Sequence, residues 1–171
     1  MRLLLALLTV VLLAAVPVRA DELMRGMVRY VYDGDTLLLV APSQGRIKVR
    51  LYGIDAPEVA TPDSAGQPFG AVARRVLMYK LLGRVVTVSP QDQDQYGRLV
   101  GVVRLDGRDV NAEMVAEGLA WAYRQYLQGP YASVYRGLEE NARRRRLGLW
   151  RQPNPMPPWE FRRLGARRRS R

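Results

Sequence analysis

The sequence has 171 residues, of which 27 are Lys or Arg and 16 are Asp or Glu, so its formal net charge is +11. It contains no cysteine and no histidine, which excludes disulfides, zinc–thiolate sites, Ser-His-Asp triads and histidine general bases. Any acid–base chemistry must therefore come from carboxylates, lysine, tyrosine or water. The basic excess predicts an anionic partner, which is a nucleic acid, an anionic membrane surface or an acidic polysaccharide.

Residues 1–20 have the pattern of an export signal. Arg2 gives a basic start, residues 3–16 are almost entirely apolar, and Val18-Arg19-Ala20 is typical of a cleavage site. An apolar helix of this length spans about 21 Å, less than a hydrocarbon core of about 30 Å, so a cleaved signal is favoured over an uncleaved membrane anchor. We expect a mature protein that begins at Asp21, is exported to the periplasm or the medium, and has no membrane span after cleavage.

The mature chain is expected to contain both strands and helices. Val28, Tyr30 and Tyr32 alternate with other residues, and Asp33-Gly34 is a strong signal for a turn between two strands. Such patterns predict strands over 24–32, 36–40, 46–52, 85–88 and 99–105, with a polar turn over 90–97. Helical spacing of apolar residues predicts helices over 70–82, 110–117 and 131–146, ended by Gly83, Gly118 and Gly148.

These elements predict an α+β protein, with a small five-stranded barrel or strongly curved sheet and three helices packed on one side. Residues 21–152 form the expected single domain, and residues 153–171 form a tail that is rich in proline and then in arginine. Trp159 and Phe161 can pack back on the domain. Residues 165–171 have arginines and no apolar anchor, so we expect this stretch to be disordered and to contact phosphates.

Two acidic segments, each a weak signal alone, together carry oxygen ligands for a divalent cation. Asp35 begins the second strand and Asp55 follows the end of the third, so antiparallel pairing brings the two carboxylates together. Carboxylates held close repel each other unless a cation lies between them. Calcium accepts about six to eight oxygen ligands, including backbone carbonyls and water. Asp35, Asp55 and the carbonyl of Ala56 therefore form the predicted calcium site, with water and phosphate completing the shell.

Arg50 and Arg98 differ from the other arginines because each lies in a motif with acidic residues and a glycine. A guanidinium can bind two phosphate oxygens at once, so we predict that these two residues hold a phosphate. The alternative for both is an ordinary surface charge. Glu58 can handle a proton, or it can form a salt bridge to one of the arginines, which is compatible with a site.

Four segments together resemble, in order and spacing, the signature of the staphylococcal nuclease (thermonuclease) family: Asp33-Gly34-Asp35-Thr36, Arg50, Asp55-Ala56-Pro57-Glu58 and Asp94-Gln95-Tyr96-Gly97-Arg98. The similarity covers roughly residues 25–150 and includes Val110-Asn111 and Gly118-Leu119-Ala120. It implies an OB-type five-stranded β-barrel with three α-helices. It also implies a calcium-dependent nuclease that acts on DNA and RNA and leaves 3′-phosphates.

The resemblance implies roles for individual residues as well. The calcium ligands and the phosphate-binding arginines would be those given above, while Glu58 would orient or deprotonate the attacking water. Tyr96 would lie against the phosphate or sugar. Tyr123 and Tyr126 lie near the family's base-stacking tyrosines, with a local spacing that differs by one residue; the alternative is that both are core aromatics.

Two positions depart from the best-known member of the family. Ala56 replaces a threonine, a mild change because only its carbonyl is a ligand, and Gln95 replaces a lysine that is thought to touch a terminal phosphate.

Three functions are compatible with the sequence. The first is an exported calcium-dependent phosphodiesterase for nucleic acids. The second is an OB-type module that binds nucleic acid without cutting it, and the third is a cationic envelope-binding protein. The clustered acids favour the first, because binding alone has no use for them. No partner interface is legible in the sequence, and we expect a monomer.

Overall fold

The computed structural model describes residues 23–169, so the predicted signal peptide lies outside the described residues. The strands are β1 Met24–Val31, β2 Thr36–Ala41, β3 Gly45–Leu51, β4 Ile54–Asp55, β5 Val85–Gln93, β6 Leu99–Leu105, β7 Arg108–Asp109 and β8 Trp121–Ala122. The helices are α1 Gly70–Leu81, α2 Val110–Ala116, α3 Pro130–Arg144, the 3-10 helix η1 Gly148–Arg151 and α4 Pro158–Arg169. No helix in the described range has the length and apolar content that a membrane crossing needs.

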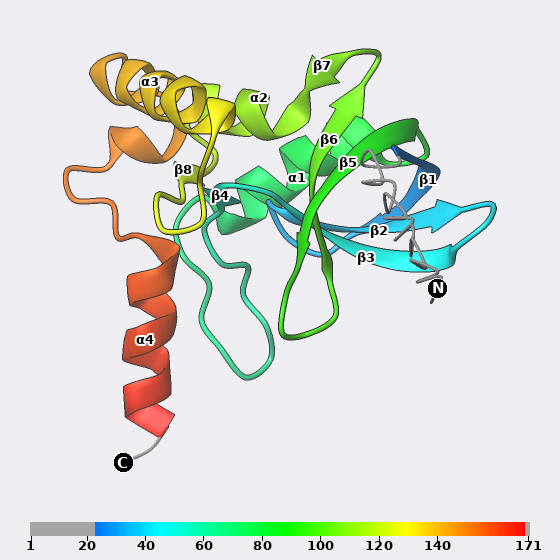
Figure 1. The fold of residues 1–171 in the computed structure, drawn as a ribbon. Helices are drawn as coiled ribbons and strands as arrows, with labels where there is room; N and C mark the ends of the chain where they lie inside the picture. Colours follow the sequence, from blue (N-terminus) through cyan, green and yellow to red (C-terminus); the bar gives the residue numbers. More distant parts are fainter. Residues whose placement is uncertain (1–22, 170–171) are drawn as a thin grey trace, which may run out of the picture.

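Five strands close into a small barrel (Figure 1). Strands β3, β2, β1, β5 and β6 are neighbours in that order through antiparallel pairing, and β3 also pairs with β6 in parallel. The parallel pair joins the first and last strands of the row and so removes the open edges of the sheet. The predicted OB-type α+β fold is therefore confirmed.

The first three helices match the predicted ones to within two residues at each end. Helices α2 and α3 lie side by side beyond one end of the barrel, and α1 packs against β1 (Figure 1). Gly83 follows α1 with a φ of 75°, the left-handed conformation that commonly ends a helix.

Two expectations are wrong. Strand β5 continues to Gln93, where the polar turn was expected, because its register against β6 shifts between Pro90 and Asp92, and such a bulge accommodates a residue without an N–H. The tail expected to be disordered over 165–171 is helical through Arg169 in α4, while residues 170–171 lie outside the described residues. Proline suits the first turn of this helix, and Trp159 in that turn packs against Trp121.

Asn111, on the first turn of α2, stabilises the barrel where β3 pairs with β6. Its side chain is completely buried. The Oδ1 atom accepts a hydrogen bond from the Val103 amide at 3.0 Å, and Nδ2 donates to the carbonyls of Tyr52 and Gly101 at 3.0 and 3.2 Å. One amide group thus satisfies three backbone groups where the parallel pair ends.

We predict that Asn111→Ala lowers the free energy of unfolding by about 3 kcal/mol, because buried backbone groups lose their partners. Urea unfolding measures the change. Asn141→Ala, at an exposed position of α3, is the matched control and is expected to change stability by less than about 0.5 kcal/mol. Equal small effects of the two substitutions would contradict the role of Asn111.

Candidate active site

The turn between β1 and β2 directs Asp35 into the protein, where its side chain is 3% exposed. The Asp35 amide donates to Oδ1 of Asp33 at 3.0 Å, which fixes the turn. Residue 34 must be a glycine because its neighbours lie too close for a side chain: a Cβ there would lie 2.6 Å from the Cβ of Ala56 and 2.7 Å from that of Ala73. Helix α1 and the segment after β4 therefore pack directly behind the turn and leave Asp35 little freedom.

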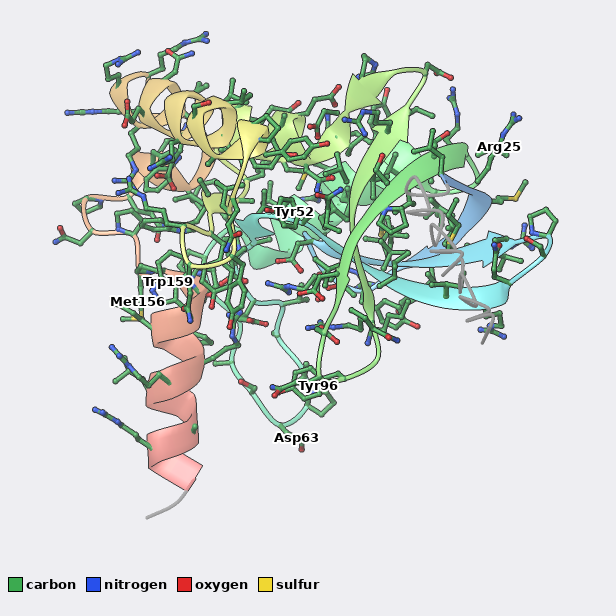
Figure 2. All side chains as sticks on the ribbon, viewed as in Figure 1. Arg25, Tyr52, Asp63, Tyr96, Met156 and Trp159 are labelled. Carbon is green, nitrogen blue, oxygen red and sulfur yellow. The ribbon has the colours of Figure 1, made fainter. Side chains whose placement is uncertain are left out.

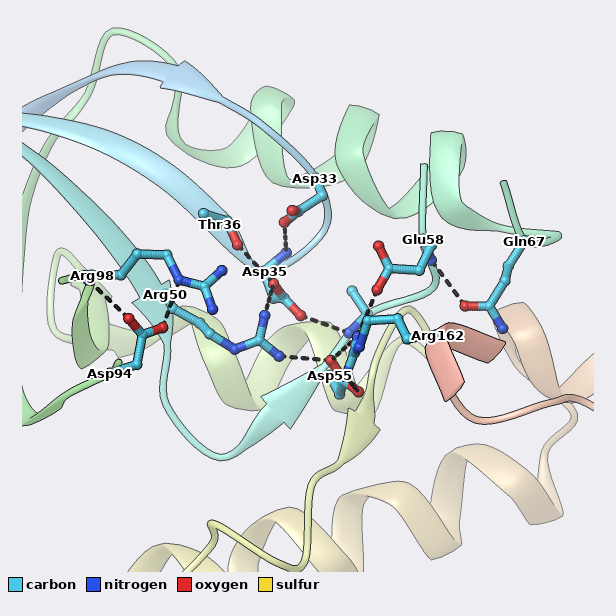
Figure 3. Close-up of polar contacts among 11 residues, drawn as sticks. Asp33, Asp35, Thr36, Arg50, Asp55, Glu58, Gln67, Asp94, Arg98 and Arg162 are labelled. Atoms are coloured by element: carbon cyan, nitrogen blue, oxygen red, sulfur yellow. Dashed lines mark hydrogen bonds and ion pairs between the residues drawn. The ribbon is translucent and has the colours of Figure 1, made fainter. Parts of the chain in front are cut away.

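Arg50 joins Asp35 to Asp55 (Figure 3). Its Nη1 donates to Oδ1 of Asp35 at 2.9 Å, and its Nη2 donates to Oδ1 of Asp55 at 2.6 Å. The β2–β3 register places Thr36 opposite Arg50, and Asp55 lies in β4 with no solvent exposure. The other oxygen of Asp35 accepts the Ala56 amide at 2.8 Å. The structure thus brings together the acids that the sequence predicted would meet.

The pKa values of the side chains around Asp35 are shifted because several carboxylates lie close together in a buried place. Burial, followed by the charge of Asp35, raises the pKa of Asp55. The same two causes raise the pKa of Asp33 to about 7. The charge of Asp35, together with that of Asp55, outweighs burial and raises the pKa of Arg50. Carboxylates crowded in this way favour a nearby cation, a role that arginine side chains fill in this structure.

Glu58 is fixed beside the cluster through its backbone. Its amide donates to Oε1 of Gln67 at 3.0 Å, and its carbonyl accepts the Gln67 amide at 2.8 Å. A Cβ at Gly70 would clash with the same carbonyl, so the start of α1 packs tightly on this segment. The carboxylate of Glu58 is 31% exposed and can be reached by water.

Arg162 from α4 also enters the cluster, and the sequence analysis assigned it no role. Its Nη1 lies 2.6 Å from Oε1 of Glu58 and 3.1 Å from Oδ1 of Asp55, and its Nη2 lies 2.9 Å from Oδ2 of Asp55 (Figure 3). The only signal for this contact was Trp159, an aromatic residue able to dock the tail on the domain.

Arg98 and Tyr96 lie at the tip of the β5–β6 hairpin. The Nε atom of Arg98 donates to Asp94 at 2.6 Å, and the ring of Tyr96 lies 5.5 Å from the Arg98 guanidinium. Burial of Asp94 is outweighed by hydrogen bonds from Arg98, which lower the pKa of Asp94. Tyr96 is 75% exposed at this tip (Figure 2), and Figure 3 draws the Arg98 side chain reaching toward Arg50 and Asp35.

Tyr123 and Tyr126 are not core side chains. Tyr126 is 56% exposed and borders a groove of about 430 Å³ that is also lined by Tyr52, Asp92 and Tyr131. Tyr123 is half-buried and packs edge-on against Tyr126, while one face of its ring is stacked on Trp159 with centroids 5.1 Å apart. In this arrangement Tyr126 presents an open surface, and Tyr123 is partly covered by α4.

The donor set fits a hard divalent cation. Asp35 and Asp55 offer carboxylate oxygens in a buried site with excess negative charge, and hard oxygens are the ligands that calcium prefers. Among residues 23–169, no group of three or more acidic, histidine or cysteine side chains is arranged to hold a metal ion. A calcium ion here would therefore depend on these two carboxylates, the carbonyl of Ala56 and water.

The OB-type barrel, together with the family and relatives that follow, defines the class of protein as a hydrolase of phosphodiester bonds. A family profile described as "Staphylococcal nuclease homologue" matches residues 48–152. The chain is 42% identical over 163 residues to a micrococcal nuclease of Shigella flexneri, which covers 90% of this chain and 88% of that protein. It is also 38% identical to Protein ParB of Escherichia coli over 169 residues, covering 94% of this chain and 90% of that protein.

A third relative is an uncharacterized endonuclease of Escherichia coli O157:H7, which is 38% identical over 138 residues and covers 80% of this chain and 84% of its own. The chain therefore belongs to the staphylococcal nuclease family, and it is a hydrolytic nuclease with nucleic acid as its substrate.

We predict that Arg50→Lys lowers the free energy of unfolding of the metal-free protein by about 1–3 kcal/mol. Lysine keeps the charge but lacks the planar fork that reaches Asp35 and Asp55 together. Arg46→Lys, at an exposed position of the same strand, serves as the control and is expected to be neutral. Urea unfolding in chelator compares the two, and an unchanged midpoint for Arg50→Lys would show that bridging contributes nothing.

Proposed function

We propose that this nuclease is exported, depends on calcium, cleaves both DNA and RNA, and leaves 3′-phosphates. The observation that carries the proposal is that Asp35, Arg50 and Asp55 come from separate elements and meet at one buried point beside Glu58. The Shigella relative is named a micrococcal nuclease, which supports the nuclease part of the proposal. The apolar pattern of residues 1–20 supports export.

The proposed metal ligands are Asp35, Asp55 and the carbonyl of Ala56. Calcium bound there supplies a Lewis acid for the phosphoryl oxygens. Arg50 and Arg98 bind phosphate oxygens and stabilise the charge that develops on them, and each such donor is worth about 10²–10³ in rate.

Glu58 orients the attacking water or accepts its proton. Its backbone is held on both sides by Gln67, while its carboxylate faces solvent. This combination of a fixed main chain and an accessible carboxylate suits a general base, which must lie within hydrogen-bond reach of its water.

Substrate contacts are proposed along the exposed aromatics. Tyr96 at the hairpin tip and Tyr126 at the groove offer surfaces for sugar or base, as does the remaining open face of Tyr123. Stacking tolerates any base, which supports action on both DNA and RNA. The net positive charge of the chain attracts either polymer, and a monomer is sufficient because the described chain supplies every residue of the proposed site.

We predict that excess chelator abolishes cleavage of both DNA and RNA without unfolding the protein, and that added calcium restores it. Calcium is also expected to raise the melting temperature, because it binds only the folded state. Asp55→Asn should lose this rise, whereas Asp92→Asn, at an exposed position of β5, should keep it.

Digestion assays, thermal melts and the phosphatase sensitivity of the product 3′-ends measure these effects. Undiminished cleavage in excess chelator would contradict the calcium dependence. Products with 3′-hydroxyl ends would contradict the proposal that cleavage leaves 3′-phosphates.

A further inference from the structure

Helix α4 docks on the active site through one face. Trp159 and Arg162 are three residues apart, so they lie on the same side of the helix. Trp159 stacks on Tyr123 and packs edge-on against Trp121, and Arg162 reaches Asp55 and Glu58. The rest of α4 extends away from the domain (Figure 1). The first turns of α4 are therefore anchored across the site and place a guanidinium inside it.

Arg162 forms hydrogen bonds with the carboxylate of Asp55, which is a proposed calcium ligand. Oδ2 of Asp55 accepts from Arg162 at 2.9 Å, and Oδ1 accepts from both Arg50 at 2.6 Å and Arg162 at 3.1 Å. Calcium binds oxygen at about 2.3–2.6 Å. An ion at that distance from either oxygen of Asp55 would lie close to a guanidinium of the same sign of charge, and this repulsion favours the withdrawal of one of the two arginines.

The charges of the cluster favour removal of one arginine when the metal enters. Three carboxylates, those of Asp35, Asp55 and Glu58, face two guanidiniums. These five side chains together carry one net negative charge. A divalent ion added to both arginines would leave an excess of positive charge in a buried place, whereas the charges balance if one arginine withdraws.

Arg162 is the arginine that can withdraw. Arg50 lies on a strand of the closed barrel, its side chain is 17% exposed, and it bridges both acids of the proposed metal site. The Arg162 side chain is 42% exposed and belongs to a terminal helix. It can swing from Asp55 into solvent without disturbing the barrel, and Glu58 would then be free to contact water.

We propose that Arg162 is a tethered cation that neutralises Asp55 and Glu58 in the metal-free protein and competes with calcium for them. The inference rests on the calcium site of the proposed function. Arg162 stabilises the metal-free state and weakens calcium binding, so its release from Asp55 accompanies formation of the active site. A nuclease built in this way keeps its general base paired with Arg162 until the metal arrives.

The test compares Arg162→Met with the unmodified protein in calcium titrations by calorimetry, without nucleic acid, and in thermal melts with and without calcium. Arg162→Met should bind calcium about tenfold more tightly, within the usual range for coupled ligands. It should also melt roughly 2–4 °C lower in chelator, and calcium should reduce or reverse this difference.

Two further variants separate the effect of the charge at position 162 from that of the guanidinium geometry and from that of positive charge elsewhere on α4. Arg163→Met removes the same charge from an exposed neighbour on the same helix and should leave both calcium affinity and the melting temperature unchanged. Arg162→Lys keeps the charge without the fork and should bind calcium with intermediate affinity.

The outcomes distinguish this inference from the proposed function. Equal calcium affinity of the unmodified protein and Arg162→Met would overturn the inference alone. Weaker binding by Arg162→Met would also overturn it, and would show that Arg162 positions the acids for the metal. No calcium binding by either protein would overturn the calcium site and the inference together.

Discussion

The active site depends on keeping two carboxylates, Asp35 and Asp55, close together where water does not reach them. Asp55 has no exposed surface and Asp35 has almost none, and buried charges in proteins need partners of opposite charge. In the metal-free protein the cations are guanidiniums. Arg50 connects the two acids from β3, and Arg162 approaches Asp55 from the opposite end of the sequence. The same unfavourable crowding of charge is the basis of the proposal that a divalent ion binds at this place.

The barrel fixes these groups by backbone packing more than by side-chain pairing. Gly34 lets the β1–β2 turn lie against α1, and Gly70 lets the start of α1 lie against the Glu58 segment. Asn111 links the residue that follows β3 to the middle of β6. Arg50 and Asp55 lie on strands, which hold functional groups more accurately than loops do, while Asp35 and Glu58 lie on segments that are packed closely against α1. The aromatic contacts proposed for substrate lie on a hairpin tip and on surface segments, where differing sequences of nucleic acid can be accommodated.

The barrel strands and the first three helices were predictable because their apolar residues repeat with the periods of strands and helices over several turns. The meeting of Asp35 and Asp55 also followed from the sequence, since antiparallel pairing brings the ends of neighbouring strands together. Strands β4 and β8 have only two residues each, too few to show a period. Helix α4 lacks an apolar stripe and is stabilised by contacts with the domain, and Arg162 meets Asp55 across 107 positions of sequence. No local pattern could indicate such a contact.

The most direct test of this account is a crystal structure of the protein grown with calcium. We expect a calcium ion about 2.3–2.6 Å from a carboxylate oxygen of both Asp35 and Asp55, with the carbonyl of Ala56 and water among its ligands. A calcium ion bound elsewhere, with Asp35 and Asp55 both outside its coordination shell, would contradict the claim that the two carboxylates are brought together to share a metal.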